Sequence, residues 1–241
     1  MKKALIALLL QVVILLPLSL TVQAQEFEKD IISTTGGDIE ITFIGHGTLM
    51  FRYNDRVIHV DPWTRFTDYK NMPKADLILI THEHMDHLDS KAIAALRQEN
   101  TKIILTETCS KQVGNGKIMK NGDVREISGF KIEAVPAYNM EKQFHPRGKG
   151  NGYIITFGEK KIYVAGDTEN IPEMKALKDI DIAFLPMNLP YTMTPEMVAD
   201  AAKAFRPGIL YPYHYGETDT SRLVELMKDE KDIEVRIRKM Q

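Results

Sequence analysis

Four residues with side chains that bind metals lie within six positions of the sequence: His82, His84, Asp86 and His87. Neutral imidazoles and a carboxylate are donors that suit zinc, and also iron or manganese, whereas calcium and magnesium prefer oxygen ligands alone. The alternative is a solvated, histidine-rich loop that binds no metal. Three of the seven histidines of the chain fall in this segment, and the apolar run at residues 77–80 would anchor it, so the spacing favours a metal site.

The elements around this segment place it in a loop between a strand and a helix. An apolar strand is predicted at residues 76–80, and Asp89 or Ser90 offers an N-cap for a helix that runs to about Gln98. Other strands are predicted at residues 39–44, 49–53, 56–60, 102–106, 124–127, 130–135, 153–157, 160–164, 182–185, 209–211 and 234–237, and other helices at 172–177, from 194 onward and at 221–227. Strands and helices alternate in both halves of the chain, which predicts mixed sheets covered by helices.

The N-terminus differs sharply in composition from the rest of the chain. Lys2 and Lys3 precede an almost unbroken apolar stretch at residues 4–20, and small residues follow up to Ala24. This order is typical of a secretory signal peptide. The alternative is an uncleaved membrane anchor, because the stretch is only marginally short of a bilayer span. We predict a signal peptide at residues 1–24, a mature domain at 25–241, and a periplasmic or secreted location with no stable membrane insertion after cleavage.

The composition of the chain narrows the class of partner. The 241 residues carry a formal net charge of −2 without a long run of one sign, so nucleic acid is not an expected partner. A hydrophobic content of 44% is enough for a sizeable core. Cys109 is the only cysteine, which excludes an intrachain disulfide, and we expect it to be a packed thiol. Nothing indicates the oligomeric state.

The histidine-rich segment matches the His-x-His-x-Asp-His motif of the metallo-β-lactamase superfamily, and further segments resemble that family in the same order. Gly166-Asp167-Thr168 resembles its Gly-Asp segment, and residues 212–215 resemble its C-terminal histidine segment. Residues 45–48 and 60–62 resemble the opening strands of a branch that includes lactone hydrolases and phospholipase-D-like enzymes. The resemblance runs from about Asp38 to the C-terminus. It implies an α/β fold of four layers, αββα, with two mixed β-sheets between helices.

The resemblance also implies a dinuclear metal site. The ligands that it assigns are His82 and His84 for the first metal, Asp86, His87 and His214 for the second, and Asp167 as a bridge between them. The family usually adds a third histidine to the first metal, within a Pro-Ala-x-His sequence where this chain has Asn139 in place of the histidine. We predict that His145, the only histidine in the interval, takes this position, with Asn139 as the alternative.

A site of this kind implies a metal-dependent hydrolase with a small-molecule substrate. Two divalent cations, zinc or alternatively manganese or iron, would lower the pKa of a shared water molecule and polarise a substrate oxygen. Asp86 and Asp167 are the residues expected to act in catalysis, Asp86 by orienting the water. The predicted substrate is an ester, a lactone or a phosphodiester. The alternatives are a weakened or non-catalytic metal-binding or sensing protein, a β-lactamase and, last, a di-iron oxidoreductase.

Other residues beside these motifs are weaker candidates. His46 is expected either to cap the backbone or to support a metal ligand, and His59 either to orient a ligand or to pack. Asp61 is expected to support a ligand, because in this fold the Asp-Pro pair ends a strand that points at the site. A pocket for a ligand with apolar and anionic parts is expected from the loop residues Trp63, Tyr138, Tyr191, Tyr213, Tyr215 and Arg147.

Overall fold

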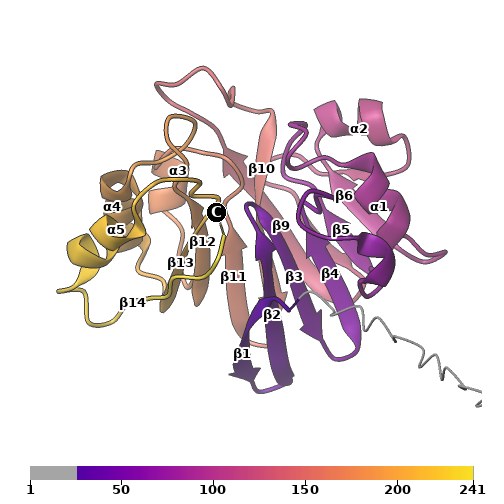
Figure 1. Cartoon of the computed structure of the whole chain (residues 1–241), viewed down its shortest axis with the longest axis horizontal. Coiled ribbons are helices and arrows are strands. Elements are labelled where there is room, and N and C mark those ends of the chain that lie inside the picture. Colours follow the sequence, from indigo (N-terminus) through magenta and orange to yellow (C-terminus); the bar gives the residue numbers. More distant parts are fainter. Residues whose placement is uncertain (1–25, 241) are drawn as a thin grey trace, which may run out of the picture.

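The structure is a computed structural model that describes residues 26–240 (Figure 1). Two seven-stranded sheets pack face to face in the middle of the molecule, with α1 and α2 beside one sheet and α3, α4 and α5 beside the other. These layers confirm the predicted αββα sandwich. The predicted signal peptide at residues 1–24 lies outside the described residues.

Each sheet takes its strands in chain order. The first contains β1 (Glu28–Thr34), β2 (Gly37–Gly45), β3 (Thr48–Tyr53), β4 (Arg56–Val60), β5 (Leu77–Leu79), β6 (Lys102–Leu105) and β7 (Lys117–Ile118), and its helical segments are η1 (Tyr69–Asn71), α1 (Ser90–Leu96) and α2 (Glu107–Val113). The second contains β8 (Val124–Ile127), β9 (Phe130–Ala137), β10 (Gly150–Phe157), β11 (Lys160–Val164), β12 (Ile182–Pro186), β13 (Ile209–Tyr213) and β14 (Glu234–Val235), and its helices are α3 (Pro172–Lys175), α4 (Pro195–Phe205) and α5 (Thr220–Met227).

The two sheets share one plan. In each, four strands form an antiparallel meander, and three further strands then add in parallel. The pairing changes from antiparallel to parallel at β4, where Val60 lies opposite Leu79 of β5. The same change comes at β11, where Val164 lies opposite Phe184 of β12. Parallel neighbours need long crossovers, and helices supply most of them, which explains why the helices gather beside these strands.

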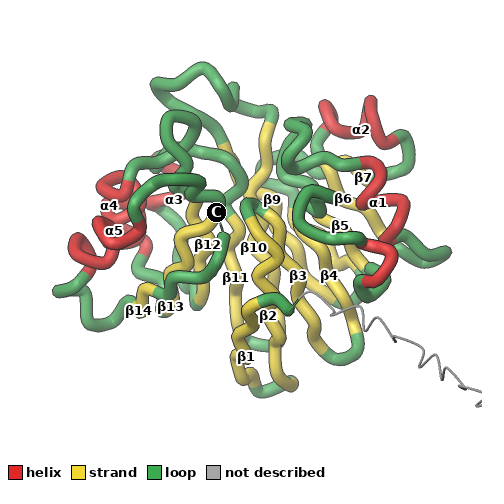
Figure 2. The backbone as a smooth tube through the Cα atoms, viewed as in Figure 1, coloured by secondary structure: helices red, strands yellow, loops and turns green. Residues whose placement is uncertain are grey.

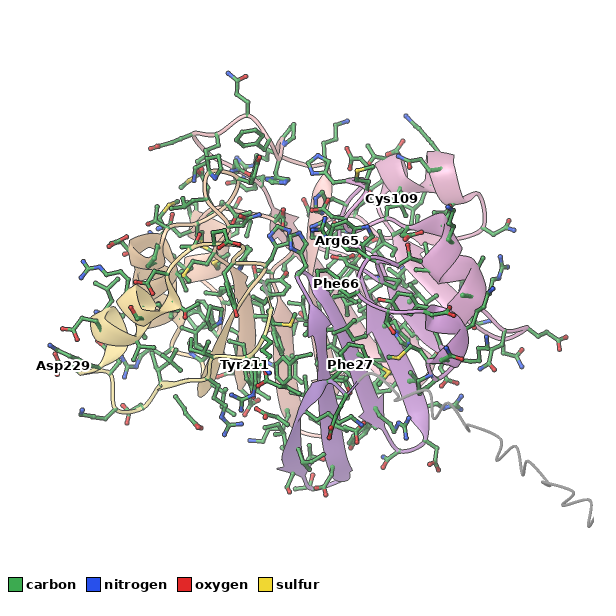
Figure 3. The ribbon with its side chains drawn as sticks, in the orientation of Figure 1. Phe27, Arg65, Phe66, Cys109, Tyr211 and Asp229 are labelled. Carbon is green, nitrogen blue, oxygen red and sulfur yellow. The ribbon has the colours of Figure 1, made fainter. Side chains whose placement is uncertain are left out.

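The main core fills the space between the two sheets. The rings of Phe43 and Phe51 on the first sheet lie 6.2 Å and 6.0 Å from the ring of Phe184 on the second. Tyr211, which is labelled in Figure 3, stacks on Phe184 at 4.9 Å. Strand β5 is buried on both faces: Leu79 belongs to this core, whereas Ile78 packs toward α1 in a second core. Such strands carry continuous apolar runs, as residues 77–80 do.

This plan brings several loops to one end of the sandwich. Strands β2, β4, β5, β9, β11 and β13 all end there, because β2 runs in the direction of β4 and β5, and β9 in the direction of β11 and β13. Loop segments gather at this end in Figure 2. Among residues 26–240, no helix has the length and apolar character needed to cross a membrane.

Four elements were not expected from the sequence: β1, η1, α2 and β7. The side chains of β1 alternate between half-buried and exposed positions, so this edge strand lacks a strong apolar pattern. The predicted helix caps are confirmed: Asp89 accepts hydrogen bonds from the first turn of α1, and Thr194 accepts one from Met197 at the start of α4. The thiol of Cys109, which lies in α2, is buried as predicted, and burial raises its pKa to about 11.

Candidate metal centre

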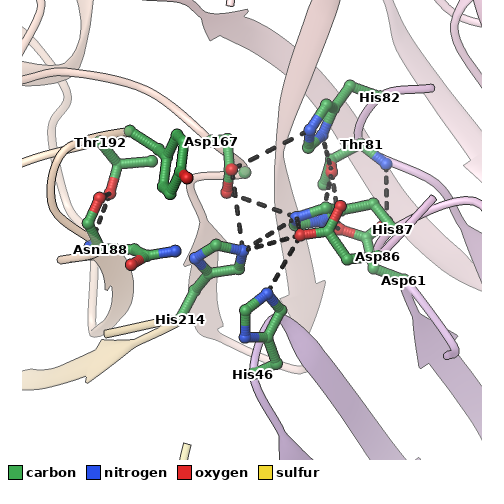
Figure 4. A network of polar contacts seen from close by, with 12 residues as sticks. His46, Asp61, Thr81, His82, Asp86, His87, Asp167, Asn188, Thr192 and His214 are labelled. Carbon is green, nitrogen blue, oxygen red and sulfur yellow. Dashed lines mark hydrogen bonds and ion pairs between the residues drawn. The ribbon is translucent and has the colours of Figure 1, made fainter. Parts of the chain in front are cut away.

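The loops at the ends of the strands bring the predicted ligands together. Figure 4 labels His82, Asp86, His87, Asp167 and His214 among them. The loop after β5 carries four of them and the β9–β10 loop carries one, while one more follows each of β11 and β13: His82, His84, Asp86, His87, His145, Asp167 and His214. At least two strands or helices separate each of these loops from the next in the sequence, so the fold as a whole assembles the cluster.

One group of the cluster consists of His82, His84 and His145. One ring nitrogen from each histidine can be chosen so that all three lie within 4.8 Å of one another. Asp167 borders this group, since its Oδ2 lies 3.2 Å from Nε2 of His145 and 4.0 Å from Nε2 of His82. Three imidazoles and one carboxylate thus face a common point, which is a donor set suited to zinc.

The second group consists of Asp86, His87 and His214, and Asp167 borders it as well. The Nε2 atoms of His87 and His214 face each other at 3.2 Å. Asp86 Oδ2 lies 3.5 Å from the His214 nitrogen, and Asp167 Oδ1 lies 3.6 Å from the His87 nitrogen. Donor atoms that share one tetrahedral zinc at about 2.0–2.1 Å lie roughly 3.4 Å apart, so these separations fit ligands of a common cation.

Buried atoms without partners provide an independent test of this fit. Within residues 26–240, His82 Nε2, Asp167 Oδ1 and His214 Nδ1 are buried and make no hydrogen bond. Buried polar side-chain atoms normally have a partner, because leaving one unpaired costs about 1–3 kcal/mol. Two of the three atoms face the centre of the cluster, where a cation would satisfy them. The residues present therefore fit a metal.

The charges of the cluster also favour a cation. Burial would lower the pKa of His87, but nearby aspartates, above all Asp167, outweigh burial and raise it to about 9. Burial would raise the pKa of Asp167, yet His214 and His87 hold it well below its usual range. Burial opposes the shift at Asp86 too, where hydrogen bonding to His214 and His46 keeps the pKa low. The carboxylates thus stay ionised and require a buried positive charge, which a proton on His87 or a metal ion can supply.

Asp61 holds the loop of the histidine-rich segment in place. Its Oδ1 accepts a hydrogen bond from the Thr81 amide at 2.8 Å, and its Oδ2 accepts hydrogen bonds from the Thr81 hydroxyl at 2.6 Å and from Nδ1 of His87 at 2.8 Å. A carboxylate on Nδ1 leaves the Nε2 lone pair of His87 free for the cluster. Asp61 therefore supports the predicted ligand His87 from behind, as expected from the sequence.

Asn139 stands behind His145. The Nδ1 of His145 donates a hydrogen bond to Asn139 Oδ1 at 2.7 Å, and the Asn139 amide nitrogen donates to the Tyr191 carbonyl at 2.9 Å. This contact turns Nε2 of His145 toward Asp167. Of the two alternatives for the vacant family histidine, His145 faces the cluster, whereas Asn139 orients it.

The two other histidines differ in their position. His46 lies in the β2–β3 turn, where its Nε2 donates to Asp86 at 3.1 Å and its ring lies 3.7 Å from that of His214. It therefore contacts the cluster directly. His59 instead donates to the Pro73 carbonyl at 3.0 Å, and burial lowers its pKa to about 4. Its role is packing, which decides between the two alternatives expected for it.

The backbone at the centre is unusual, and sequence reasoning did not single this out. His46, Asp61 and His214 all have left-handed φ angles, at 56°, 44° and 47°, a conformation that costs about 1–3 kcal/mol in residues other than glycine. At Gly47, an added Cβ would lie 2.9 Å from Cε1 of His87 and 3.4 Å from Cδ2 of His214. A glycine here lets the β2–β3 turn approach both histidine rings.

An open cleft of about 490 Å³ leads to the cluster. Its walls include Trp63 and Tyr191, as expected, together with residues that were not expected: Arg65, Met85, Phe144 and Asn188. The predicted pocket was wrong in its other members. Tyr213 and Tyr215 are buried. Arg147 lies over the Tyr138 ring outside the cleft, where it pairs with the Glu173 carboxylate at 2.6 Å and is neutralised.

Comparison with known proteins agrees with this architecture. A family model described as the beta-lactamase superfamily domain matches residues 40–214, which contain all seven residues of the cluster. The chain belongs to the metallo-β-lactamase superfamily. This confirms the family resemblance that the sequence motifs indicated.

Within the metallo-β-lactamase superfamily, the chain belongs to the UPF0173 metal-dependent hydrolases. It is 30% identical over 213 residues to a member from Geobacillus sp. (strain WCH70), covering 79% of this chain and 94% of that protein. It is 31% identical over 190 residues to a member from Thermococcus onnurineus (strain NA1), covering 73% of this chain and 84% of that protein.

Solved structures of the metallo-β-lactamase superfamily share the fold. A structure described as a metal-dependent hydrolase from Parabacteroides distasonis ATCC 8503 is 53% identical, with a TM-score of 0.87, and covers 90% of this chain and 100% of that chain. Igni18, a metallo hydrolase from Ignicoccus hospitalis, has a TM-score of 0.71 at 24% identity and covers 84% of this chain and 96% of that chain. The likeness to Igni18 shows the fold alone.

Proposed function

We propose that this chain binds two divalent cations, with zinc favoured over manganese or iron, and hydrolyses an ester, a lactone or a phosphodiester of a small molecule. The observation that carries the proposal is the cluster itself, in which Asp167 lies between two groups of donors and a buried oxygen of this residue has no hydrogen-bond partner. Membership of a family named metal-dependent hydrolases supports it. Residues 45–48 resemble the opening strands of the branch with lactone hydrolases and phospholipase-D-like enzymes, so we rank lactones and phosphodiesters above β-lactams as substrates.

The proposed ligands follow the two groups. His82, His84 and His145 would hold one cation. Asp86, His87 and His214, whose donor atoms lie 3.2–3.7 Å apart, would hold the other. Asp167 would bridge the two. When bound, the two cations would supply a water molecule of lowered pKa and would polarise the substrate oxygen.

The chain's own residues would prepare this chemistry before substrate binds. Asp61 and Asn139 fix the rings of His87 and His145 through their Nδ1 atoms, so the opposite nitrogens point inward without further ordering. The side chain of Asp86 is 27% exposed, and it therefore reaches both the cluster and the cleft. We assign to Asp86 the orientation of the water molecule, with His46 holding the carboxylate in place.

Metal analysis followed by a substrate screen tests the proposal. Protein stripped with a chelator and reloaded with zinc, manganese or iron should retain about two ions per chain after gel filtration. It should then hydrolyse aryl esters, lactones or phosphodiesters only when loaded. Retention of one ion without hydrolysis of any class would favour a metal-binding protein, and zinc-dependent turnover of nitrocefin would place β-lactams first.

We also propose that the chain is exported, on the order of basic, apolar and small residues at positions 1–24. Mass spectrometry of the full-length product expressed in a Gram-negative bacterium should find a mature N-terminus at Gln25 in the periplasmic fraction. Intact Met1 in the membrane fraction would instead support an N-terminal anchor.

A further inference from the structure

The cleft beyond the metal cluster has an apolar side. Met85, Phe144 and Tyr191 line it with 79%, 43% and 44% of their surfaces exposed, and the rings of Phe144 and Tyr191 meet edge to face at 4.9 Å. The described residues contain nine exposed large hydrophobic side chains. Three of the nine line the cleft, and Met140 and Leu189 stand in the same two loops as Phe144 and Tyr191. This concentration marks a binding surface.

The loop after β4 brings a cation to the same cleft. The exposed Arg65 guanidinium lies 5.3 Å from the centre of the Trp63 ring, and Figure 3 labels Arg65 beside Phe66 near the strand ends. Among residues 26–240, no carboxylate lies within 4.0 Å of Arg65. Arg147, by contrast, pairs with Glu173. An arginine stacked on an aromatic ring and free of a carboxylate is well suited to bind an anionic group.

Arg65 is connected to the metal cluster through a short series of contacts. The Trp63 ring under Arg65 lies 5.3 Å from the His46 ring, and His46 in turn donates to Asp86. The phenylalanine and tyrosine of the apolar side border the same cleft as Asp86. The cluster therefore shares one cleft of about 490 Å³ with a cation and an apolar surface, and this volume falls within the range of small-molecule sites.

We propose that the substrate is an amphiphilic anion: an ester or lactone with an apolar chain or ring that packs against Phe144, Tyr191 and Met85, and a carboxylate, sulfate or phosphate group that binds Arg65. The inference rests on the proposed function, because the bond to be cleaved would lie over the metal cluster. It goes further by naming the two groups that flank that bond. Recognition of each group is measurable as binding, without turnover.

Trp63 provides a direct readout, because it is the only tryptophan of the chain and lies in the cleft. We would titrate metal-loaded protein with octane-1-sulfonate below its micelle concentration, since a sulfonate is a weak metal ligand and leaves the cluster free. Octyltrimethylammonium reverses the charge, and methanesulfonate lacks the chain. The expected result is a saturable change of Trp63 fluorescence with octane-1-sulfonate. The dissociation constants for octyltrimethylammonium and methanesulfonate should be at least about tenfold larger.

Two pairs of variants assign the binding to the named side chains. Arg65→Gln should weaken octane-1-sulfonate binding about tenfold, whereas the matched control Arg147→Gln should leave it unchanged. Tyr191→Ala should weaken binding several-fold, whereas Val224→Ala, which removes a similarly exposed apolar side chain on α5, should not. Equal affinities in Arg65→Gln and wild type would overturn the proposal, as would equal affinities for the anionic and cationic probes.

Separate outcomes distinguish this inference from the proposed function. Octane-1-sulfonate binding that depends on Arg65, in protein that holds no metal and hydrolyses nothing, would contradict the hydrolase and retain the binding site. Hydrolysis with the same KM in wild type and Arg65→Gln, together with unchanged sulfonate binding, would contradict the amphiphilic substrate alone. A response to phosphatidylglycerol vesicles without any response to octane-1-sulfonate would overturn the proposal in favour of a lipid surface.

Discussion

Two clusters of ionisable residues in this molecule solve the problem of buried charge differently. In the first cluster, Asp30 of β1 accepts hydrogen bonds from Nη2 of Arg238 at 2.7 Å and 2.8 Å. Arg236 and Tyr211 also contact Asp30. Arg238 further lies over the Phe43 ring at 5.6 Å. Each charge there has a partner of the opposite sign within the chain.

The metal cluster is compensated less completely within the chain. Asp167 and Asp86 face histidines, and buried atoms of His82 and Asp167 have no hydrogen-bond partner. The ion pairs of Asp30 join β1 of the first sheet to the segment that follows β14 of the second, which is a structural role. Unpaired buried atoms also occur elsewhere in the described residues, for example at Thr42 and Tyr163, but at the metal cluster they lie among several metal-binding side chains. This combination indicates that the charges of the metal cluster serve binding.

The largest effect is expected from Asp167→Asn. Because Asp167 borders both groups of donors, the change should reduce the metal content from about two ions per chain to less than one, and it should reduce kcat/KM at least about 100-fold. Elemental analysis after gel filtration, with kinetics on the substrate found in the screen, measures both. Unchanged metal content would show that Asp167 does not bridge the two cations.

His145→Ala should affect one group only. The metal content is expected to fall from about two ions to about one, because His82 and His84 remain as the only imidazoles of that group. Elemental analysis measures the change, and His59→Ala is a control that removes a buried histidine without any contact to the cluster. Two ions retained in the His145 variant would show that this histidine is not a ligand.

Substitutions behind the ligands should have smaller effects. Asn139→Ala removes the acceptor that orients His145. Asp61→Asn replaces one accepting oxygen with an NH2 group, so the side chain can no longer accept from both the Thr81 amide and His87. Metal affinity should fall about 10–100-fold in each variant. Competition with a fluorescent chelator should show the loss at one ion in each case. A loss equal to that of removing the histidine itself would assign these residues a larger role than orientation.

These supporting contacts mark the limit of prediction from the sequence. The four ligands after β5 are adjacent in the chain, and Asp167 and His214 follow strands, so their convergence could be predicted from motifs and strand order. His145 could be selected because no other histidine lies in the interval. That Asn139 lies behind His145 depends on how the β9–β10 loop folds back, which no local pattern encodes.

The choice of cleft arginine could not be predicted for the same reason. Arg65 and Arg147 both lie in loops near motif segments, and only the position of Glu173, 26 residues after Arg147, decides that Arg147 is neutralised elsewhere. Strand β1 was missed because it lacks a strong apolar pattern, and a contact that helps to hold it could not be read locally. Its Asp30 pairs with Arg238, 208 residues later.

The smallest effect on metal binding is expected from Asp30→Asn. It should leave two ions per chain but lower the free energy of unfolding by about 1–3 kcal/mol, because it weakens hydrogen bonds to charged groups. Denaturant unfolding with elemental analysis measures both quantities. Metal loss in this variant would erase the distinction between the two clusters.

The same pair predicts a pH dependence of stability. Burial would raise the pKa of Asp30, but Tyr211 and Arg238 lower it below its ordinary value. Its contribution is therefore present above the unfolded pKa of about 4 and is lost as the pH falls through the lower folded value. Between pH 5 and pH 2, Asp30→Asn should lose less stability than wild type, as followed by urea unfolding of metal-free protein. Parallel curves would contradict this assignment.

Anomalous diffraction from crystals of the zinc-loaded protein tests the central claim most directly. We predict two peaks, one bordered by His82, His84 and His145 and the other by Asp86, His87 and His214, with Asp167 in contact with both. A single peak, or none within this cluster in crystals grown with excess zinc, would contradict the dinuclear centre.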